Sequence, residues 1–186
     1  MSGCAQAPVD EALTFAPITA ERVDDVIAVL TSTRWDYFVR PVHTAASARA
    51  SWDEGDWSGP DSAGYLVEID WQPVGLVRLH DLEDDTPMFD VRLCENARGR
   101  GIGSACVEWV IREFFEVQDR RRIEAQTRND NLAMRATLRR CGFVKEAHYR
   151  AADPHGMDWV AYGLLRGDWE TGTTTPVPWD DEAGAG

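Results

Sequence analysis

Residues 88–114 constrain the fold of this chain more than any other stretch, because they join a strand to a helix through a run of glycines. The segment MFDVRL at 88–93 alternates apolar and polar residues, which is typical of a half-buried strand. Glycines stand at 99, 101 and 103, and apolar residues at 107, 110, 111 and 114 then recur on one helix face. Such a turn leaves backbone N–H groups unpaired at the positive end of a helix dipole, where phosphate binds.

The spacing of these glycines separates the turn from two common nucleotide-binding motifs. Gly99, Gly101 and Gly103 occupy every second position, whereas the dinucleotide motif reads GxGxxG, and the sequence has no Gly-Lys-Ser/Thr of a P-loop. A plain tight turn before a helix would also carry glycines. The turn by itself is therefore only weak evidence for a phosphate site, and a plain tight turn remains the alternative.

The periodicity of the remaining chain predicts strands interleaved with single helices. Helices are expected at 18–33, at 47–59 as a weaker element, and at 131–142, and strands at 63–70, 75–82, 121–127, 143–150 and 157–166. The first two of these strands flank the Pro/Gly turn WQPVG and predict a hairpin. This order predicts a mixed, largely covered sheet of the α/β or α+β class. Residues 1–13 are expected to form an N-terminal extension, and the acidic, Pro/Gly-rich residues 171–186 a disordered tail.

Composition and charge exclude several functions. The net charge of −13 over 186 residues argues against nucleic-acid binding. Residues 1–91 carry 5 Lys and Arg against 17 Asp and Glu, but residues 92–150 carry 13 against 8, so the region of the glycine turn is basic. No apolar stretch is long enough for a membrane helix, and the N-terminus lacks a secretory pattern. We expect a soluble, cytoplasmic protein without a membrane partner.

Cysteine and histidine spacing argue against a metal site. The four cysteines are far apart with no CxxC pair, and the four histidines show no paired spacing. Reduced, mostly buried thiols are expected.

A second motif lies about thirty residues after the glycine turn, where an Asn precedes a helix that ends in Gly-Phe. The combination resembles the GNAT superfamily of acyl-CoA-dependent N-acetyltransferases, and more closely its branch of bacterial ribosomal-protein and small-amine acetyltransferases. The residues that match the family pattern are Arg98, Gly101, Gly103, Asn131, Gly142 and Phe143. The resemblance covers residues 14–170 and implies the GNAT fold: a mixed, mostly antiparallel sheet splayed into a V and flanked by about four helices.

The resemblance also implies acetyl-CoA as the cofactor, lying where strand 88–93 separates from strand 121–127. Its pyrophosphate would lie on the amides of residues 99–103, and its pantetheine arm would follow the open strand edge. The residues expected to bind it are Leu93, Arg98, Gly99, Arg100, Gly101, Ile102, Gly103, Asn131 and Arg135. Arg139 and Arg140 are expected to be solvated helix charges instead.

For catalysis, the resemblance implies that the backbone N–H groups of Leu93 and Cys94 stabilise an oxyanion. A base must deprotonate the amine. Asp90 is the first candidate, with a structural role beside an arginine as the alternative, and Glu124 is the second. The family Glu falls near Pro87 and Met88 here, and the family Tyr that protonates the leaving thiolate matches Leu138.

The acceptor is expected to be a small-molecule or peptide amine. Residues Trp35, Asp36, Tyr37 and Trp57 interleave aromatic rings with acidic residues and would suit a cationic amine. The alternative is a Trp-rich edge of the core. A non-catalytic acyl-CoA-binding sensor and an unrelated phosphate- or nucleotide-binding protein remain as other functions. A homodimer is also compatible with the sequence.

Overall fold

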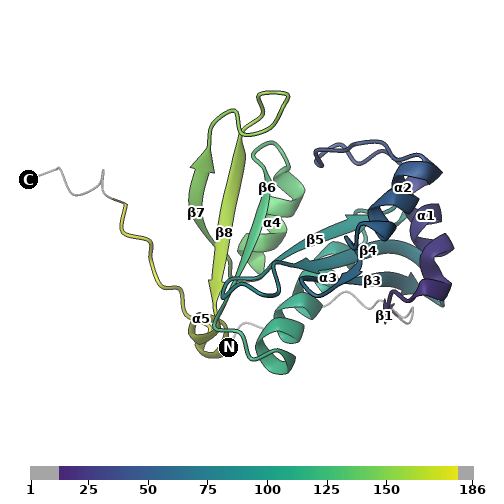
Figure 1. The fold of residues 1–186 in the computed structure, drawn as a ribbon. Helices are drawn as coiled ribbons and strands as arrows, with labels where there is room; N and C mark the ends of the chain where they lie inside the picture. Colours follow the sequence, from purple (N-terminus) through teal and green to yellow (C-terminus); the bar gives the residue numbers. More distant parts are fainter. Residues whose placement is uncertain (1–12, 180–186) are drawn as a thin grey trace, which may run out of the picture.

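The computed structural model describes residues 13–179, which form one mixed sheet covered by helices (Figure 1). The strands are β1 (Leu13–Pro17), β2 (Ser58–Gly59), β3 (Ser62–Ile69), β4 (Gln72–His80), β5 (Met88–Leu93), β6 (Arg122–Arg128), β7 (Val144–Tyr149) and β8 (Trp159–Leu165). The helices are α1 (Val23–Thr31), α2 (Ala45–Asp53), α3 (Ile102–Arg112), α4 (Leu132–Arg140) and α5 (Arg166–Thr171). The sheet order is β1-β3-β4-β5-β6-β8-β7, with β2 beside β3.

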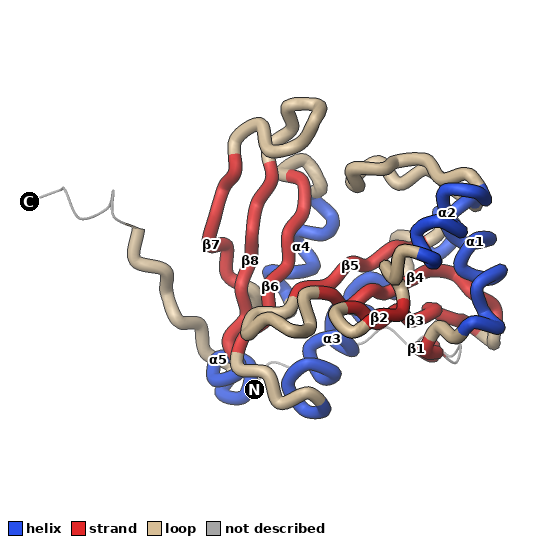
Figure 2. Tube along the Cα trace, in the orientation of Figure 1, coloured by secondary structure: helices blue, strands red, loops and turns tan. Residues whose placement is uncertain are grey.

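The sheet opens between β5 and β6, which confirms the splayed, mostly antiparallel GNAT fold (Figures 1 and 2). These two strands are parallel and pair at one position only, Met88 opposite Glu124. Their neighbours pair over six positions between β4 and β5 and over seven between β6 and β8. Beyond Met88 the two strands therefore diverge, and their facing edges have no strand partner within residues 13–179.

Two apolar clusters fix the β1–β5 half of the sheet from opposite faces. On one face α3 buries Val107 and Val110 completely. On the other face Leu30 of α1 packs with Leu66 of β3 and Leu76 of β4, all fully buried. Each such side chain contributes roughly 1.5–3 kcal/mol to folding. The apolar residues of β5 face α3, so Asp90 and Arg92 project toward α1 and α2.

The expected hairpin is confirmed, but its turn differs from the predicted segment WQPVG. The connection is Asp70 and Trp71, both with positive φ (48° and 66°), and β4 already begins at Gln72. Two left-handed residues match the twist of a two-residue hairpin. Pro73 therefore lies within β4, opposite Glu68.

The sequence reading missed β1, β2 and α5. Five residues ending in proline are too short to show a clear period, and β1 is stabilised by pairing with β3 along its whole length. At the other end, the buried carboxylate of Asp168 in α5 accepts hydrogen bonds from the amide (2.8 Å) and hydroxyl (2.7 Å) of Thr175. The expected domain boundaries stay predictions, and most of both expected terminal segments, 1–12 and 180–186, lies outside the described residues. Within residues 13–179, the helices are too short or too polar to span a bilayer.

Candidate active site

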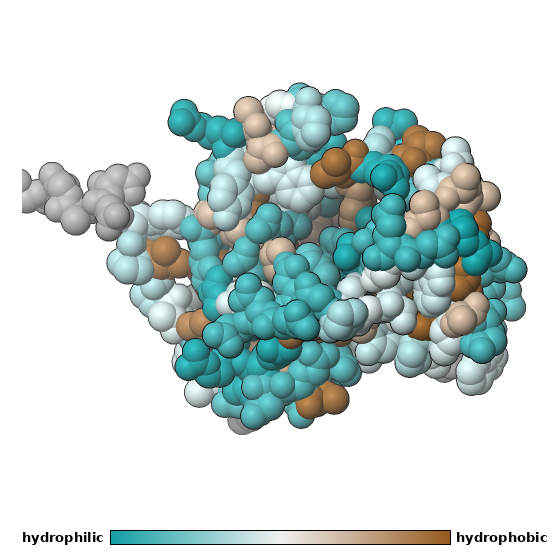
Figure 3. All heavy atoms as spheres, in the orientation of Figure 1, coloured by the Kyte–Doolittle hydropathy of each residue, from teal (hydrophilic) through white to brown (hydrophobic). Residues whose placement is uncertain are grey.

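A cleft of about 590 Å³ lies between the diverging strands β5 and β6. Both strands, the glycine turn before α3, helix α4 and the loop between α1 and α2 (residues 32–44) line it. Figure 3 shows the surface hollowed between the two halves of the molecule, with mostly hydrophilic residues around the hollow. The cleft is thus formed by the opening in the sheet and partly covered by one loop.

The glycine turn places backbone amides at one end of this cleft. Gly99 and Gly101 have φ of +73° and +84°, which an L side chain rarely adopts. A Cβ at either position would meet no atom within 4 Å, so the backbone conformation, rather than lack of space, requires glycine. Gly101 is the N-cap of α3, and in the described chain the amides of Gly99, Gly101, Ile102 and Gly103 donate to no protein group. The side chain of Ile102 is buried in the core, so its backbone alone is available to a ligand.

The pairing of β5 with β4 decides which of its amides face the cleft. The amide of Cys94 donates to the carbonyl of Val74 at 2.9 Å, so it is directed away from the cleft and is not available as an oxyanion donor. Because successive amides of a strand point to opposite sides, the amide of Leu93 is directed toward the open edge. The Cys94 thiol lies 3.3 Å from the hydroxyl of Ser32. Of the two expected donors, only Leu93 is placed for the role.

Arg98 holds the end of β5 against the loop that follows α1. Its Nε donates to the carbonyl of Leu93 at 2.9 Å, and Nη2 lies 3.4 Å from the carbonyl of Arg34. The guanidinium also lies 5.8 Å from the ring centre of Trp35. Arg98 therefore fixes the peptide unit between Leu93 and Cys94 as well as adding positive charge at the glycine turn.

Asn131 lines the cleft as the N-cap of α4. Its side-chain oxygen accepts from the amide of Met134 (3.2 Å), and its side-chain nitrogen donates to the hydroxyl of Thr127 (3.0 Å). These contacts fix the carboxamide and leave one N–H for a ligand.

Two of the three arginines of α4 lie elsewhere than the sequence indicated. Arg135 does not line the cleft: its guanidinium donates to the carbonyl of Asn129 (2.6 Å) and the hydroxyl of Tyr162 (3.2 Å). Arg140, which was expected to be a solvated charge, lines the cleft and donates to the hydroxyl of Ser104 at 2.9 Å.

Of the two candidate bases, the structure brings only Asp90 to the cleft. Its carboxylate is half-buried and lies 4.0 Å from Nη2 of Arg92. Glu124 lies at the closed end of the split, where its two carboxylate oxygens contact Arg122 (3.3 Å) and Gln126 (3.0 Å). Glu124 is thus part of a surface ion cluster outside the cleft lining.

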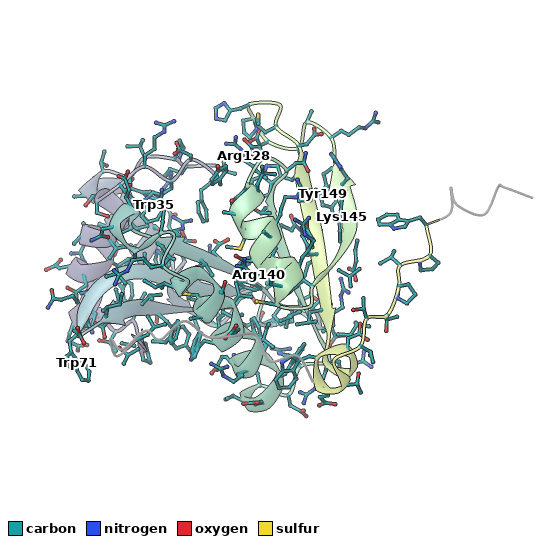
Figure 4. The ribbon with its side chains drawn as sticks, turned by 180° about the vertical axis from the view of Figure 1, so that it is seen from behind. Trp35, Trp71, Arg128, Arg140, Lys145 and Tyr149 are labelled. Atoms are coloured by element: carbon teal, nitrogen blue, oxygen red, sulfur yellow. The ribbon has the colours of Figure 1, made fainter. Side chains whose placement is uncertain are left out.

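The expected acceptor residues are only partly brought together. Trp35, Asp36 and Tyr37 line the cleft, whereas Trp57 is buried in the core and donates its Nε1 hydrogen to the hydroxyl of Ser51. The alternative of a Trp-rich core edge therefore describes Trp57 and also Trp35, which is equally buried and donates its Nε1 hydrogen to the carbonyl of Leu30 at 2.9 Å. Figure 4 shows Trp35 on one half of the molecule and Arg128 and Arg140 on the other half.

Sequence reasoning missed Phe38, Arg92 and Arg128 as site residues. Arg92 was considered only as a partner of Asp90, although it lies on the same face of β5 and lines the cleft. The alternation of β5 could have identified it, since both residues project from the strand that borders the opening. No local pattern identifies Arg128, because its contacts with the α1–α2 loop are distant in sequence.

Comparison with known proteins identifies the class. The family described as "Acetyltransferase (GNAT) domain" matches residues 12–144 of this chain. The chain therefore belongs to the GNAT acetyltransferase family, as the sequence motifs indicated.

Solved structures of similar fold agree with this assignment. Spermidine N-acetyltransferase from Vibrio cholerae, in complex with CoA and spermine, superposes with a TM-score of 0.74 at 16% identity, covering 85% of this chain and 98% of that chain. A GNAT-family acetyltransferase from Bacillus anthracis gives a TM-score of 0.71 at 16% identity, covering 82% and 94%. At this level of identity the likeness shows a shared fold.

The protein is thus an acetyl-CoA-dependent acetyltransferase, and the described residues fit the cofactor. The sheet is open where a pantetheine arm would need a free strand edge. The glycine turn offers backbone amides that lack protein partners, in a conformation that keeps side chains out of their way.

Proposed function

We propose that this protein transfers an acetyl group from acetyl-CoA to the primary amine of a small molecule or peptide, within the cleft between β5 and β6. The observation that carries this proposal is the opening that follows the single β5–β6 pair at Met88 and ends near the glycine turn, where the amides of Gly99, Gly101 and Gly103 have no partner among the described residues. The amides of residues 99–103 would hold the pyrophosphate, and Arg98 and Arg140 add positive charge nearby. Acetyl-CoA supplies an acetyl group activated as a thioester.

Two features of the chain would favour the reaction. The Leu93 amide, on the edge of β5 that borders the cleft, would donate to negative charge that develops beside the strand edge, and Arg98 fixes the next peptide unit through the Leu93 carbonyl. The α1–α2 loop lies over the cleft and excludes water from part of it, which strengthens such interactions.

Asp90 is the proposed proton acceptor for the incoming ammonium. Of the two candidate bases it is the one in the lining of the cleft, and it lies 4.0 Å from Nη2 of Arg92. Leu138, at the position of the family tyrosine, is fully buried and supplies no proton. Water is therefore the proposed proton donor for the leaving thiolate.

Release of free thiol from acetyl-CoA, measured over a panel of primary amines, tests this proposal. We expect amine-dependent release with at least one member of the panel. If CoA raises the melting temperature but no amine stimulates release, the chain is better described as an acyl-CoA-binding sensor.

A further inference from the structure

Arg92 of β5 is a nearly buried cation that lines the cleft on the side of α1 and α2. Its side chain is 12% exposed, and its guanidinium carbon lies 4.0 Å from the ring centre of Phe38 and 5.7 Å from that of Trp57. The side chain therefore passes between aromatic rings beneath the α1–α2 loop. A cation at such a place has lost most of its contact with water.

The hydrogen-bonding capacity of Arg92 is largely unused. A guanidinium has five N–H donors. In the described chain, Nη1 lies 3.4 Å from Nε2 of His43, Nη2 lies 4.0 Å from the Asp90 carboxylate, and the buried Nε has no partner. Burial of a charge with so few partners destabilises a protein, so the arrangement favours binding of an anion.

His43 behind Arg92 adds a second unused donor. Because a guanidinium only donates, Nε2 of His43 must accept from it, and Nδ1 then carries the imidazole proton. Nδ1 is buried and has no partner among the described residues. Burial, with the nearby charges of Arg92 and Arg40, lowers the pKa of His43 to about 4, so the ring is neutral at neutral pH.

The charges around Arg92 do not balance. Arg40 and Arg78 are the nearby cations, and Asp56 and Asp90 are the nearby anions. Asp56 is already held by Arg78 (3.6 Å) and by the hydroxyl of Ser51 (2.6 Å). Among these groups three cations stand against two carboxylates, which leaves an excess of one positive charge around Arg92.

The aromatic rings expected to bind a cationic amine already face arginines of the chain. Arg98 lies over Trp35 at 5.8 Å, and Arg128 lies over Tyr37 at 5.4 Å. Phe38 likewise faces Arg92. A polycationic acceptor would therefore enter a site whose ring faces are occupied by positive charge.

We infer that Arg92 binds a carboxylate of the acceptor, so that the substrate is an amino carboxylate rather than a polyamine. The inference rests on the proposed function, since it names the acceptor class of that same cleft. Arg92 directly follows Val91 and precedes Leu93, whose amide borders the proposed acyl site, and consecutive Cα atoms are about 3.8 Å apart. The carboxylate and the reacting amine would thus lie on one small molecule.

A matched panel of ligands tests this inference on the unmodified protein. Each set contains an amino acid, its amide and the corresponding decarboxylated amine, and binding is measured by calorimetry with CoA present. We expect the amino acid to bind about 10 to 100 times more tightly than its amide or amine, the range for one hydrogen-bonded charge pair. Equal or tighter binding of the amides and amines, or of spermidine, would overturn the inference.

The variant Arg92→Met gives a second test, because methionine keeps an apolar side chain of similar length. We expect kcat/KM for the amino acid to fall about 10- to 100-fold, kcat/KM for its amide to change little, and the affinity for CoA to stay the same. Arg49→Met, on the exposed face of α2, is the matched control. Equal losses for both substrates would contradict the assigned role.

The two tests separate the inference from the proposed function. If amines are acetylated without preference for a carboxylate, the proposed function stands and the inference is wrong. If no amine is acetylated, the proposed function is wrong, and the calorimetric comparison still decides whether Arg92 binds an anion. Should Arg92→Met fail to fold, the ligand panel on the unmodified protein decides alone.

Discussion

Nη1 of Arg128 donates a hydrogen bond of 2.6 Å to the backbone carbonyl of Asp36, although 92 positions separate the two residues in sequence. Arg128 ends β6, and Asp36 lies in the α1–α2 loop, so the bond joins the two halves of the split sheet across the cleft. An ion pair with Asp130 (2.6 Å) and the ring of Tyr37 (5.4 Å) fix the same guanidinium. The loop over the cleft is therefore held at its far side by one side chain.

Replacement of Arg128 by glutamine should release this loop. We expect KM for the acceptor to rise several-fold, amide hydrogen exchange at 34–38 to become faster, and the free energy of unfolding to fall by only about 1 kcal/mol. Arg150→Gln, an exposed position on the same half, is the control. Unchanged exchange in the loop would show that the bond does not restrain it.

Replacement of Gly101 by alanine separates backbone strain from ligand binding. Gly156, in the loop between β7 and β8, has a similar φ (+73° against +84°), and a Cβ there also meets no atom within 4 Å. Each change to alanine should cost about 1–2 kcal/mol of stability, because both place a side chain at positive φ. Only Gly101→Ala should also weaken CoA binding, measured by calorimetry, and similar CoA affinities in the two variants would contradict the phosphate-binding role.

Replacement of Asp90 by asparagine tests the proposed base. General base catalysis contributes roughly 10² to 10⁴ in rate, so kcat should fall by that order while CoA affinity is retained. Glu124→Gln is the matched control, since it changes a carboxylate outside the cleft lining and should leave kcat nearly unchanged. A large loss of kcat in Glu124→Gln, with little change in Asp90→Asn, would instead identify Glu124 of β6 as the base.

The lowered pKa of His43 predicts that the stability of the protein depends on pH. Its pKa is about 4 in the folded protein against 6.5 for an unperturbed histidine, chiefly through burial, so the unfolded chain binds more protons between these values. The free energy of unfolding should therefore fall as pH decreases from 6.5 to 4. Because the ring is only half-buried, solvent screening reduces the effect.

Chemical denaturation across this pH range measures the contribution of His43. The slope should be smaller in His43→Gln and unchanged in His155→Gln, which alters an exposed histidine. Identical slopes in the unmodified protein and His43→Gln would show that this ring titrates normally.

The sequence predicted the parts of the fold that depend on local periodicity. The strand MFDVRL and the helix after the glycine turn follow from side-chain spacing, and the structure places β5 at Met88–Leu93. β1 could not be predicted in this way, because its formation depends on β3, about fifty residues later.

The candidate site was less predictable, since it depends on strand pairing and long-range contacts. The direction of the Cys94 amide is decided by its pairing with Val74, which no local pattern shows. Trp35 and Trp57 look alike in the sequence and are buried in the same cluster, and only the folded chain shows that Trp35 also borders the cleft. The alternation of β5 indicates the face on which Arg92 lies, but its buried Nε without a partner among the described residues is a property of the folded chain.

The central claim is that acetyl-CoA binds in the split between β5 and β6, with its phosphates on the glycine turn. Titration of the ¹⁵N-labelled protein with CoA, followed by two-dimensional amide NMR, tests this claim most directly. We predict the largest shifts at the amides of Gly99, Gly101, Gly103 and Leu93. A smaller second pocket, whose lining includes Arg135, Arg139 and Lys145, should show little change. Shifts concentrated at that second pocket, with the glycine turn unaffected, would contradict the account.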